Sequence, residues 1–268
     1  MSKPNFGEIQ LQSCFNQAIF SYYQKQGQYL NPVIPTLAQE ASVFYDTAFA
    51  IDDFPYPKID DQEGCNLFIQ YKLSQSISKK TNPLYGHWGK TFFRFQFPHS
   101  KLDEATGILD YHQFNGLREL ADKGCAVFYF TNDVVTREAL FHDTASGILL
   151  ERAPILDVSE ITQRHKFATF AFDSDHFCLH SDPIKVRRIN FKKVDHILRE
   201  KRNDLGEDNK ILFSVLREVG GTSGFADMFI DRYHELQDGP AKNRRVKKFL
   251  LLRAAFRTLL GIDIVRFV

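Results

Sequence analysis

Polar and apolar residues alternate along the stretch NLFIQYKLSQ, residues 66–75, in the way that predicts a β-strand. After a three-residue apolar run, the polar residues Gln70, Lys72 and Ser74 are separated by single apolar residues. Because successive side chains of a strand point to opposite faces, Gln70 and Lys72 share one face. That face is either the solvated side of a strand at a sheet edge or part of a site that needs an amide oxygen beside a cation.

The same kind of pattern predicts the other elements of the fold. Apolar spacing close to the helical period predicts helices over residues 6–26, 36–42, 110–124, 191–202 and 209–221, and along the segment from residue 242. Alternating or continuous apolar runs predict strands over residues 46–51, 90–97 and 125–132, and a hairpin over 166–182. Residues 75–90 are polar with two glycines and a proline, which predicts a loop. Helices and strands interleaved in this order predict a mixed α/β fold.

Composition narrows the class of protein. The chain has 268 residues, of which 43% are hydrophobic and 26 are Phe, which is typical of a packed globular protein. Its four cysteines form no C-x-x-C pair, which disfavours a structural zinc site and favours reduced thiols. No apolar stretch has the length of a membrane-spanning helix, and the first residues lack the apolar core of a signal peptide. We therefore expect a cytoplasmic protein without a membrane partner.

Charge is distributed unevenly along the chain. The formal net charge is only +1, so the molecule as a whole should not attract polyanions. Residues 242–268 carry eight cations and one carboxylate, which leaves +7 there and −6 on the remainder. The predicted nucleic-acid-binding residues in this segment are Lys242, Arg244, Arg245, Lys247, Lys248 and Arg253. A basic helix here could contact phosphates, dock on an acidic partner or on the acidic remainder of the chain, or simply meet water.

Carboxylates upstream of Gln70 suggest a metal site. Asp46 opens the predicted strand 46–51, and Glu40 lies six residues earlier, in the predicted short helix. If that strand pairs with 66–73, a carboxylate would lie beside an amide oxygen and an ammonium. Mg²⁺ prefers oxygen ligands and usually takes one or two protein carboxylates, so Asp46 and Gln70 could hold Mg²⁺ or Mn²⁺. Lys72 could then offset the charge on a phosphate or orient a water.

The arrangement Glu40 … Asp46 … Gln70-Tyr71-Lys72, followed by a helix and a buried strand, resembles the PD-(D/E)XK nuclease superfamily. The resemblance covers about residues 36–132 and implies a restriction-endonuclease-like αβββαβ core. We expect this core to form a domain over residues 1–150, with a mixed extension over 151–268 that is not an independent domain. It also implies that the function is Mg²⁺-dependent cleavage of DNA, in bacterial defence against phage. In that interpretation Glu40 orients the water shell of the metal.

Two departures from the superfamily pattern leave alternatives open. Gln70 replaces the acidic residue of the strand motif, and Tyr45 precedes Asp46 where the superfamily has proline. A neutral amide binds magnesium more weakly than a carboxylate does. One alternative is therefore a catalytically inactive nuclease-like subunit that binds or scaffolds a larger complex. Another is an interaction protein that uses its aromatic-rich surface and basic C-terminus to bind a protein partner or a second copy of itself.

Overall fold

The computed structural model describes residues 1–26, 65–97, 111–180, 183–201, 205–220, 224–236, 241–260 and 262–267. Its helices are α1 (Glu8–Gln24), α4 (Tyr85–Trp88), α5 (Tyr111–Asp122), α6 (Arg137–Ala145), α7 (Leu149–Arg152), α8 (Phe191–Glu200), α9 (Leu205–Gly220), α10 (Gly224–Glu235) and α11 (Ala241–Leu260), with a 3₁₀ turn η1 (Val158–Glu160). Its strands are β1 (Cys65–Lys72), β2 (Gln75–Ile77), β3 (Phe92–Gln96), β4 (Ala126–Thr131), β5 (Ile155–Asp157), β6 (Phe167–Ala171), β7 (His176–His180), β8 (Ile184–Arg187) and β9 (Asp263–Phe267). The fold is mixed α/β, as the sequence predicted.

Local sequence signals explain several element boundaries. Thr136 caps α6 by accepting a hydrogen bond from the Ala139 backbone N–H at 3.2 Å. Asn190 caps α8 in the same way, accepting from the Lys193 N–H at 3.1 Å. Just past the end of α5, Gly124 has φ +86°, a left-handed conformation that glycine adopts without a steric penalty. The chain can therefore turn directly from α5 into β4.

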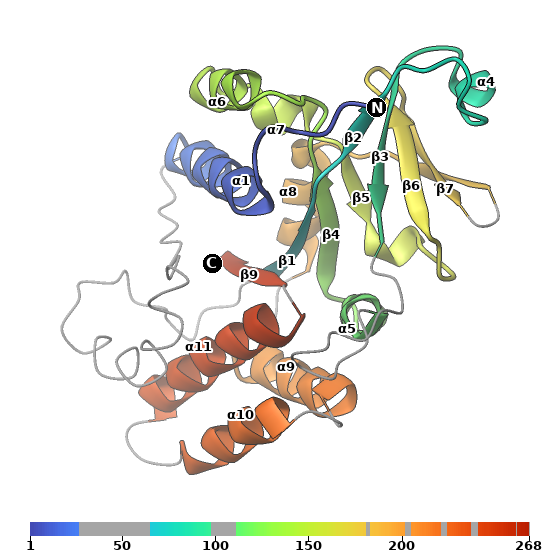
Figure 1. Cartoon of the computed structure of the whole chain (residues 1–268). Coiled ribbons are helices and arrows are strands. Elements are labelled where there is room, and N and C mark those ends of the chain that lie inside the picture. Colours follow the sequence, from blue (N-terminus) through green and yellow to red (C-terminus); the bar gives the residue numbers. More distant parts are fainter. Residues whose placement is uncertain are drawn as a thin grey trace.

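The strands form two sheets (Figure 1). The four-stranded sheet has the order β5-β4-β1-β9, in which β1 is parallel to β4 and antiparallel to β9. The five-stranded sheet has the order β2-β3-β6-β7-β8 and is antiparallel throughout. Only two residues, Leu73 and Ser74, separate β1 from β2. One extended stretch of chain therefore supplies a strand to each sheet.

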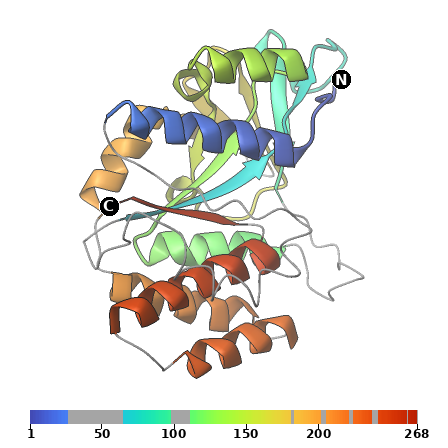
Figure 2. The ribbon, with the colours of Figure 1, turned by 90° about the vertical axis from the view of Figure 1, so that its left-hand side faces the viewer.

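Alternation along β1 and β4 places a hydrophobic cluster on each face of the four-stranded sheet. Leu67, Ile69 and Tyr71 belong to the cluster formed with α1, α6, α7 and α8, whereas Phe68 belongs to the opposite one. The opposite cluster includes side chains of the five-stranded sheet and of α5, α9, α10 and α11. Figure 2 shows α1 crossing the sheet on one side, with α9, α10 and α11 grouped beyond α5 on the other.

Most predicted elements in the described ranges are confirmed, whereas α6, α7, α10, β5, β8 and β9 were not predicted. Residues 75–90, predicted as a loop, contain β2 and α4. The strand predicted at 90–97 is β3, but it belongs to the second sheet rather than to the sheet of β1. Strand β9, which the sequence did not predict, pairs with β1 from Cys65 to Ile69. The predicted helix 36–42 and strand 46–51 lie outside the described residues.

The two segments that the sequence suggested, 1–150 and 151–268, share both sheets. In the four-stranded sheet, β5 pairs with β4 and β9 pairs with β1. In the five-stranded sheet, β6 pairs with β3. The later segment therefore completes both sheets instead of only covering them. Of the helices described, none is long and apolar enough to span a membrane.

Candidate functional site

The predicted site residues Gln70 and Lys72 lie at the carboxyl end of β1, beside the parallel strand β4. Gln70 is in register with Tyr129, and Lys72 with Thr131. In α/β sheets, the carboxyl ends of parallel strands are the usual place for ligand binding. Gln70 and Lys72 thus lie at the kind of position where ligand-binding residues are usually found in such sheets.

Gln70 is buried, with a relative exposure of 2%, and only one end of its amide is bonded. Its Nε2 donates a hydrogen bond to the backbone oxygen of Tyr71 at 3.1 Å. Its Oε1 has no hydrogen-bond partner among the described residues. Flipping the amide would put two acceptor oxygens together, so the orientation with a free oxygen is the chemically sound one. An acceptor oxygen without a donor costs free energy in a core and is available to a cation.

A second polar atom without a partner among the described residues belongs to Tyr129, the residue beside Gln70 on β4. Tyr129, the register partner of Gln70, is fully buried in the same cluster as Phe68, and its hydroxyl has no partner in the described part of the chain. Burial raises the pKa of the Tyr129 hydroxyl well above its usual range, so it stays protonated. The two strands therefore place on the same face of the sheet an amide and a hydroxyl whose oxygens have no partner among the described residues.

Lys72 ends β1 and is half-buried. Its charge reaches the start of α1, where it acts on the carboxyl of Glu8. Desolvation of that carboxyl raises the pKa of Glu8, and the positive charge of Lys72 opposes the rise. The first turn of α1 thus supplies a carboxylate within the electrostatic range of Lys72, which the sequence analysis did not single out.

Beyond these residues, buried hydrogen bonds fasten the ends of β1 and β4 together. The Ser74 and Thr131 hydroxyls lie 2.5 Å apart, and Thr131 also donates to the Lys72 backbone oxygen at 2.6 Å. Asn132 accepts from the Ser74 N–H at 2.8 Å and donates to the Ser74 oxygen at 3.0 Å. These bonds hold the backbone around Lys72 against the end of β4.

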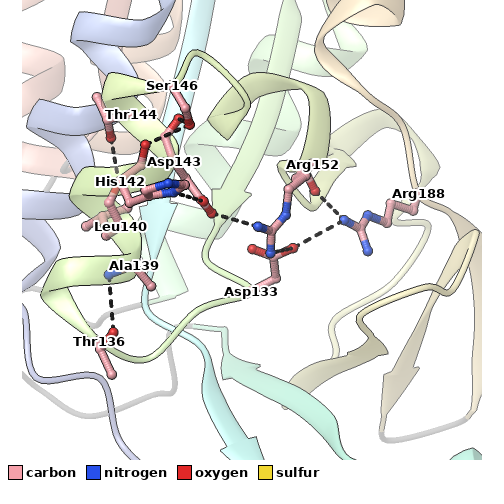
Figure 3. A network of polar contacts seen from close by, with 10 residues as sticks. All are labelled: Asp133, Thr136, Ala139, Leu140, His142, Asp143, Thr144, Ser146, Arg152 and Arg188. Carbon is pink, nitrogen blue, oxygen red and sulfur yellow. Dashed lines mark hydrogen bonds and ion pairs between the residues drawn. The ribbon is translucent and has the colours of Figure 1, made fainter.

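Directly after Asn132 begins a network of two carboxylates and two arginines (Figure 3). Arg152 of α7 donates to Asp143 of α6 at 2.9 Å and lies 3.5 Å from the Asp133 carboxylate. Arg188, just after β8, lies 3.9 Å from Asp133 and donates to the Arg152 backbone oxygen. The guanidinium of Arg152 also stacks 4.7 Å from the ring centre of Phe172.

Burial dominates the electrostatics of this network. It raises the pKa of Asp133, while Arg152 and Arg188 act in the opposite direction. It lowers the pKa of Arg188, against the effect of Asp133. Because each carboxylate faces a guanidinium, we interpret the network as a connection between the two sheets rather than as a reactive group. The sequence offered one signal for it, the polar residues that follow the buried strand β4.

The remaining predicted site residues are distributed as follows. Glu40 and Asp46 lie outside the described residues. Within the described ranges, no three His, Cys, Asp or Glu side chains converge as a metal site would require. Strand β9 occupies the edge of β1 up to Ile69, so on that side only Gln70 to Lys72 are free of it.

The predicted nucleic-acid-binding residues lie on α11, which packs against α9 and α10. Arg245 is exposed, whereas Arg244, Lys247, Lys248 and Arg253 are partly buried. Burial lowers the pKa of Lys248, whose ammonium lies 4.3 Å from the centre of the Tyr233 ring. Lys242 belongs to the first turn of the helix. Part of this basic segment is therefore used in packing.

Comparisons with protein-family models, with curated proteins and with solved structures gave no match to this chain.

Proposed function

We propose that this chain is a metal-dependent nuclease that hydrolyses phosphodiester bonds of DNA, built on a restriction-endonuclease-like core. One observation carries the proposal. The amide oxygen of Gln70 lies at the carboxyl end of a parallel strand pair and accepts no hydrogen bond from the described residues. Gln70 is also two residues before Lys72, so the two side chains share one face of the strand. After β1 the chain forms β2, α4 and β3, and then returns through α5 to β4, which pairs parallel to β1. This return through a helix supports the proposal, because the superfamily that the sequence resembles has a helix and a core strand after its motif.

Each residue would have a defined role. Gln70 Oε1 and the Asp46 carboxylate would hold Mg²⁺ or Mn²⁺, since both supply the oxygen ligands that these ions prefer. The bound ion would supply Lewis-acid activation of water and phosphate. Lys72 would offset the negative charge that develops on the phosphate, and Glu40 would orient a water. Following the resemblance, we place this activity in the bacterial cytoplasm, in defence against phage.

A second candidate function is a catalytically inactive subunit with the same core. The observation that favours it is the burial of Gln70, which is 2% exposed and neutral where the superfamily carries an acid. A site that has lost its charge could persist as part of a core while the protein binds or scaffolds a complex.

Cleavage of supercoiled plasmid with Mg²⁺ or Mn²⁺ tests the proposal. We expect nicking by the wild type, and a loss of about 100-fold or more in Asp46→Ala and Lys72→Ala, because each removes charge stabilisation at the phosphate. Lys192→Ala, an exposed lysine on α8, is the matched control and should keep full activity. Circular dichroism checks that each variant is folded.

The other outcomes are also informative. Absence of cleavage of plasmid, single-stranded DNA and RNA with either ion would favour the inactive subunit. Cleavage that persists in both Asp46→Ala and Lys72→Ala would contradict the proposed site.

A further inference from the structure

The five-stranded sheet has an outer face that the proposed active site does not use. Alternate residues of its strands, such as Phe95 and Phe170, enter the hydrophobic cluster beneath the sheet. The residues between them point the other way. The register sets Arg94, Thr169, Cys178 and Lys185 in one row across four strands, with Phe167 beside His180 in the next. We call this surface the outer face; Figure 1 shows its sheet at one side of the molecule, with α4 at its end.

Cations outnumber carboxylates on the outer face and the loops beside it, where the exposed Asp175 pairs with His176. The five strands and the loop from Ser78 to Thr91 contain no Asp or Glu, although the whole chain has 33. Arg94 lies on β3, and the exposed Lys185 and Arg187 lie on β8. The loop adds three lysines, of which Lys90 pairs with Asp173. A local excess of cations in a chain of net charge +1 favours a polyanionic ligand.

Aromatic rings are held in fixed positions on the same face. Trp88 of α4 stacks on His176, with ring centres 5.3 Å apart and planes inclined by 22°. Its indole N–H donates to the buried Thr169 hydroxyl at 3.2 Å, which ties α4 to the sheet. In the neighbouring row, Phe167 stacks on His180 at 4.6 Å. Both Trp88 and Phe167 remain partly exposed.

We propose that the outer face binds single-stranded nucleic acid. Arg94, Lys185 and Arg187 contact phosphates, and the partly exposed rings of Trp88 and Phe167, each held by a stacked histidine, are available to bases. Cationic grooves interleaved with aromatic rings are the general solution for single strands, because every base has a face that can stack. This surface is separate from Gln70 and Lys72, and its ligand binding does not require cleavage.

Geometry favours a single strand over a duplex or a single phosphate. Arg94 and Lys185 lie on strands three intervals apart in the sheet order, which is about 14 Å at the usual strand spacing. A ligand that contacts both must therefore be extended. The bases of a duplex are stacked on each other, so they cannot stack on rings of a sheet surface.

The protein's single tryptophan provides the test, because its emission reports on this face alone. Unlabelled oligodeoxythymidine is titrated into the full chain in EDTA, at low and at moderate salt, and Trp88 emission is followed. We expect quenching, with an affinity that falls as salt rises. Lys185→Glu/Arg187→Glu should weaken binding at least tenfold. Lys192→Glu/Lys193→Glu makes the same charge change on exposed residues of α8 and should leave the affinity unchanged within about twofold.

Four outcomes would overturn the proposal. The first is unchanged emission together with unchanged anisotropy of a labelled oligonucleotide. The second is equal affinity of the two double variants. The third is quenching by heparin, a polyanion without bases, that matches quenching by the oligonucleotide. The fourth is equal affinity for a duplex. Because EDTA removes the metal, binding without cleavage activity would support this surface even if the proposed nuclease function failed.

Discussion

Single residues in the polar interior fall into two groups, those whose polar side-chain atoms are hydrogen-bonded and those that keep a polar atom without a partner among the described residues. Ser74, Thr131 and Asn132 belong to the first group, since each is bonded to a neighbour at the ends of β1 and β4. Gln70 and Tyr129 belong to the second. A free buried oxygen is a cost that a core residue of similar shape would avoid, so its presence points to a use.

Gln70→Met tests whether the amide oxygen of Gln70 serves metal binding and not the stability of the fold. The change removes the hydrogen bond to the Tyr71 oxygen but also removes the unpaired oxygen, so the two effects partly cancel. We expect the free energy of unfolding, measured in urea, to change by less than about 1.5 kcal/mol. Metal-dependent plasmid cleavage should fall by about 100-fold or more. Gln96→Met, at an exposed position on β3, is the control, and unchanged cleavage in Gln70→Met would contradict a metal-binding role.

The buried carboxyl of Asp133 should make the stability of the fold depend on pH. Burial raises the pKa of this carboxyl in the folded state, whereas the unfolded chain keeps a value of about 3.9. Between those two values the folded state binds more protons, so the Asp133 contribution to the free energy of unfolding falls as pH rises through this window. In Asp133→Asn that fall should be missing from urea unfolding curves collected from pH 3 to 6.

The control for this prediction is Asp231→Asn, because Asp231 is exposed on α10 and should follow the wild type. Identical slopes of stability against pH in wild type and Asp133→Asn would show that burial does not dominate at Asp133.

At the scale of elements, the short helix α7 is placed by charge as well as by packing. Leu149 and Leu150 are buried, and Arg152 connects the helix to α6 through Asp143 and to the end of β4 through Asp133. The same network reaches the second sheet, because Arg188 follows β8. The ion-pair network thus contributes, together with apolar packing, to the relative position of α6, α7 and the ends of β4 and β8.

Arg152→Ala should be strongly destabilising. Asp133 and Asp143 have side chains that are 5% and 6% exposed, so removing their shared guanidinium leaves buried carboxylates with reduced compensation. We expect a loss of about 3–5 kcal/mol in the free energy of unfolding, measured in urea. Arg137→Ala, at an exposed position of α6, should stay within about 0.5 kcal/mol of the wild type. A loss below 1 kcal/mol in Arg152→Ala would contradict a role in holding these elements together.

At the scale of the whole molecule, the two sheets are joined along one strand. β1 passes into β2 after two residues, and strands from the beginning and the end of the chain pair within the four-stranded sheet. Ile264 of β9 is fully buried in the cluster that also contains Phe170 of the second sheet. Such interleaving favours a single cooperative unit.

The cooperative unit can be tested with two probes. Urea unfolding followed by Trp88 emission, which reports on the second sheet, should coincide with unfolding followed by helical circular dichroism. Ile264→Ala should shift both transitions by the same amount, a destabilisation of about 2–5 kcal/mol. Ile9→Ala, at a 60% exposed position on α1, should shift neither. A Trp88 transition unmoved by Ile264→Ala would mean that the second sheet unfolds separately.

The sequence by itself determined the elements that local periodicity encodes. Alternation predicted β1 and the shared face of Gln70 and Lys72, and a continuous apolar run predicted the buried strand β4. Helical spacing predicted α1, α5, α8, α9 and α11. These predictions succeed because the period of side chains along a helix or strand depends only on neighbouring residues. Glu40 and Asp46, the predicted carboxylates, stay predictions.

Only the tertiary structure decided what depends on contacts between distant residues. It placed β9 against β1, about 200 residues away in the sequence, and β3 in a second sheet. It showed that Gln70 is buried with an oxygen that no described residue hydrogen-bonds, and that Asp133, Asp143, Arg152 and Arg188 form one network. Strand pairing and burial depend on which segments meet across the core. The alternation of residues within one segment does not specify which other segment it pairs with.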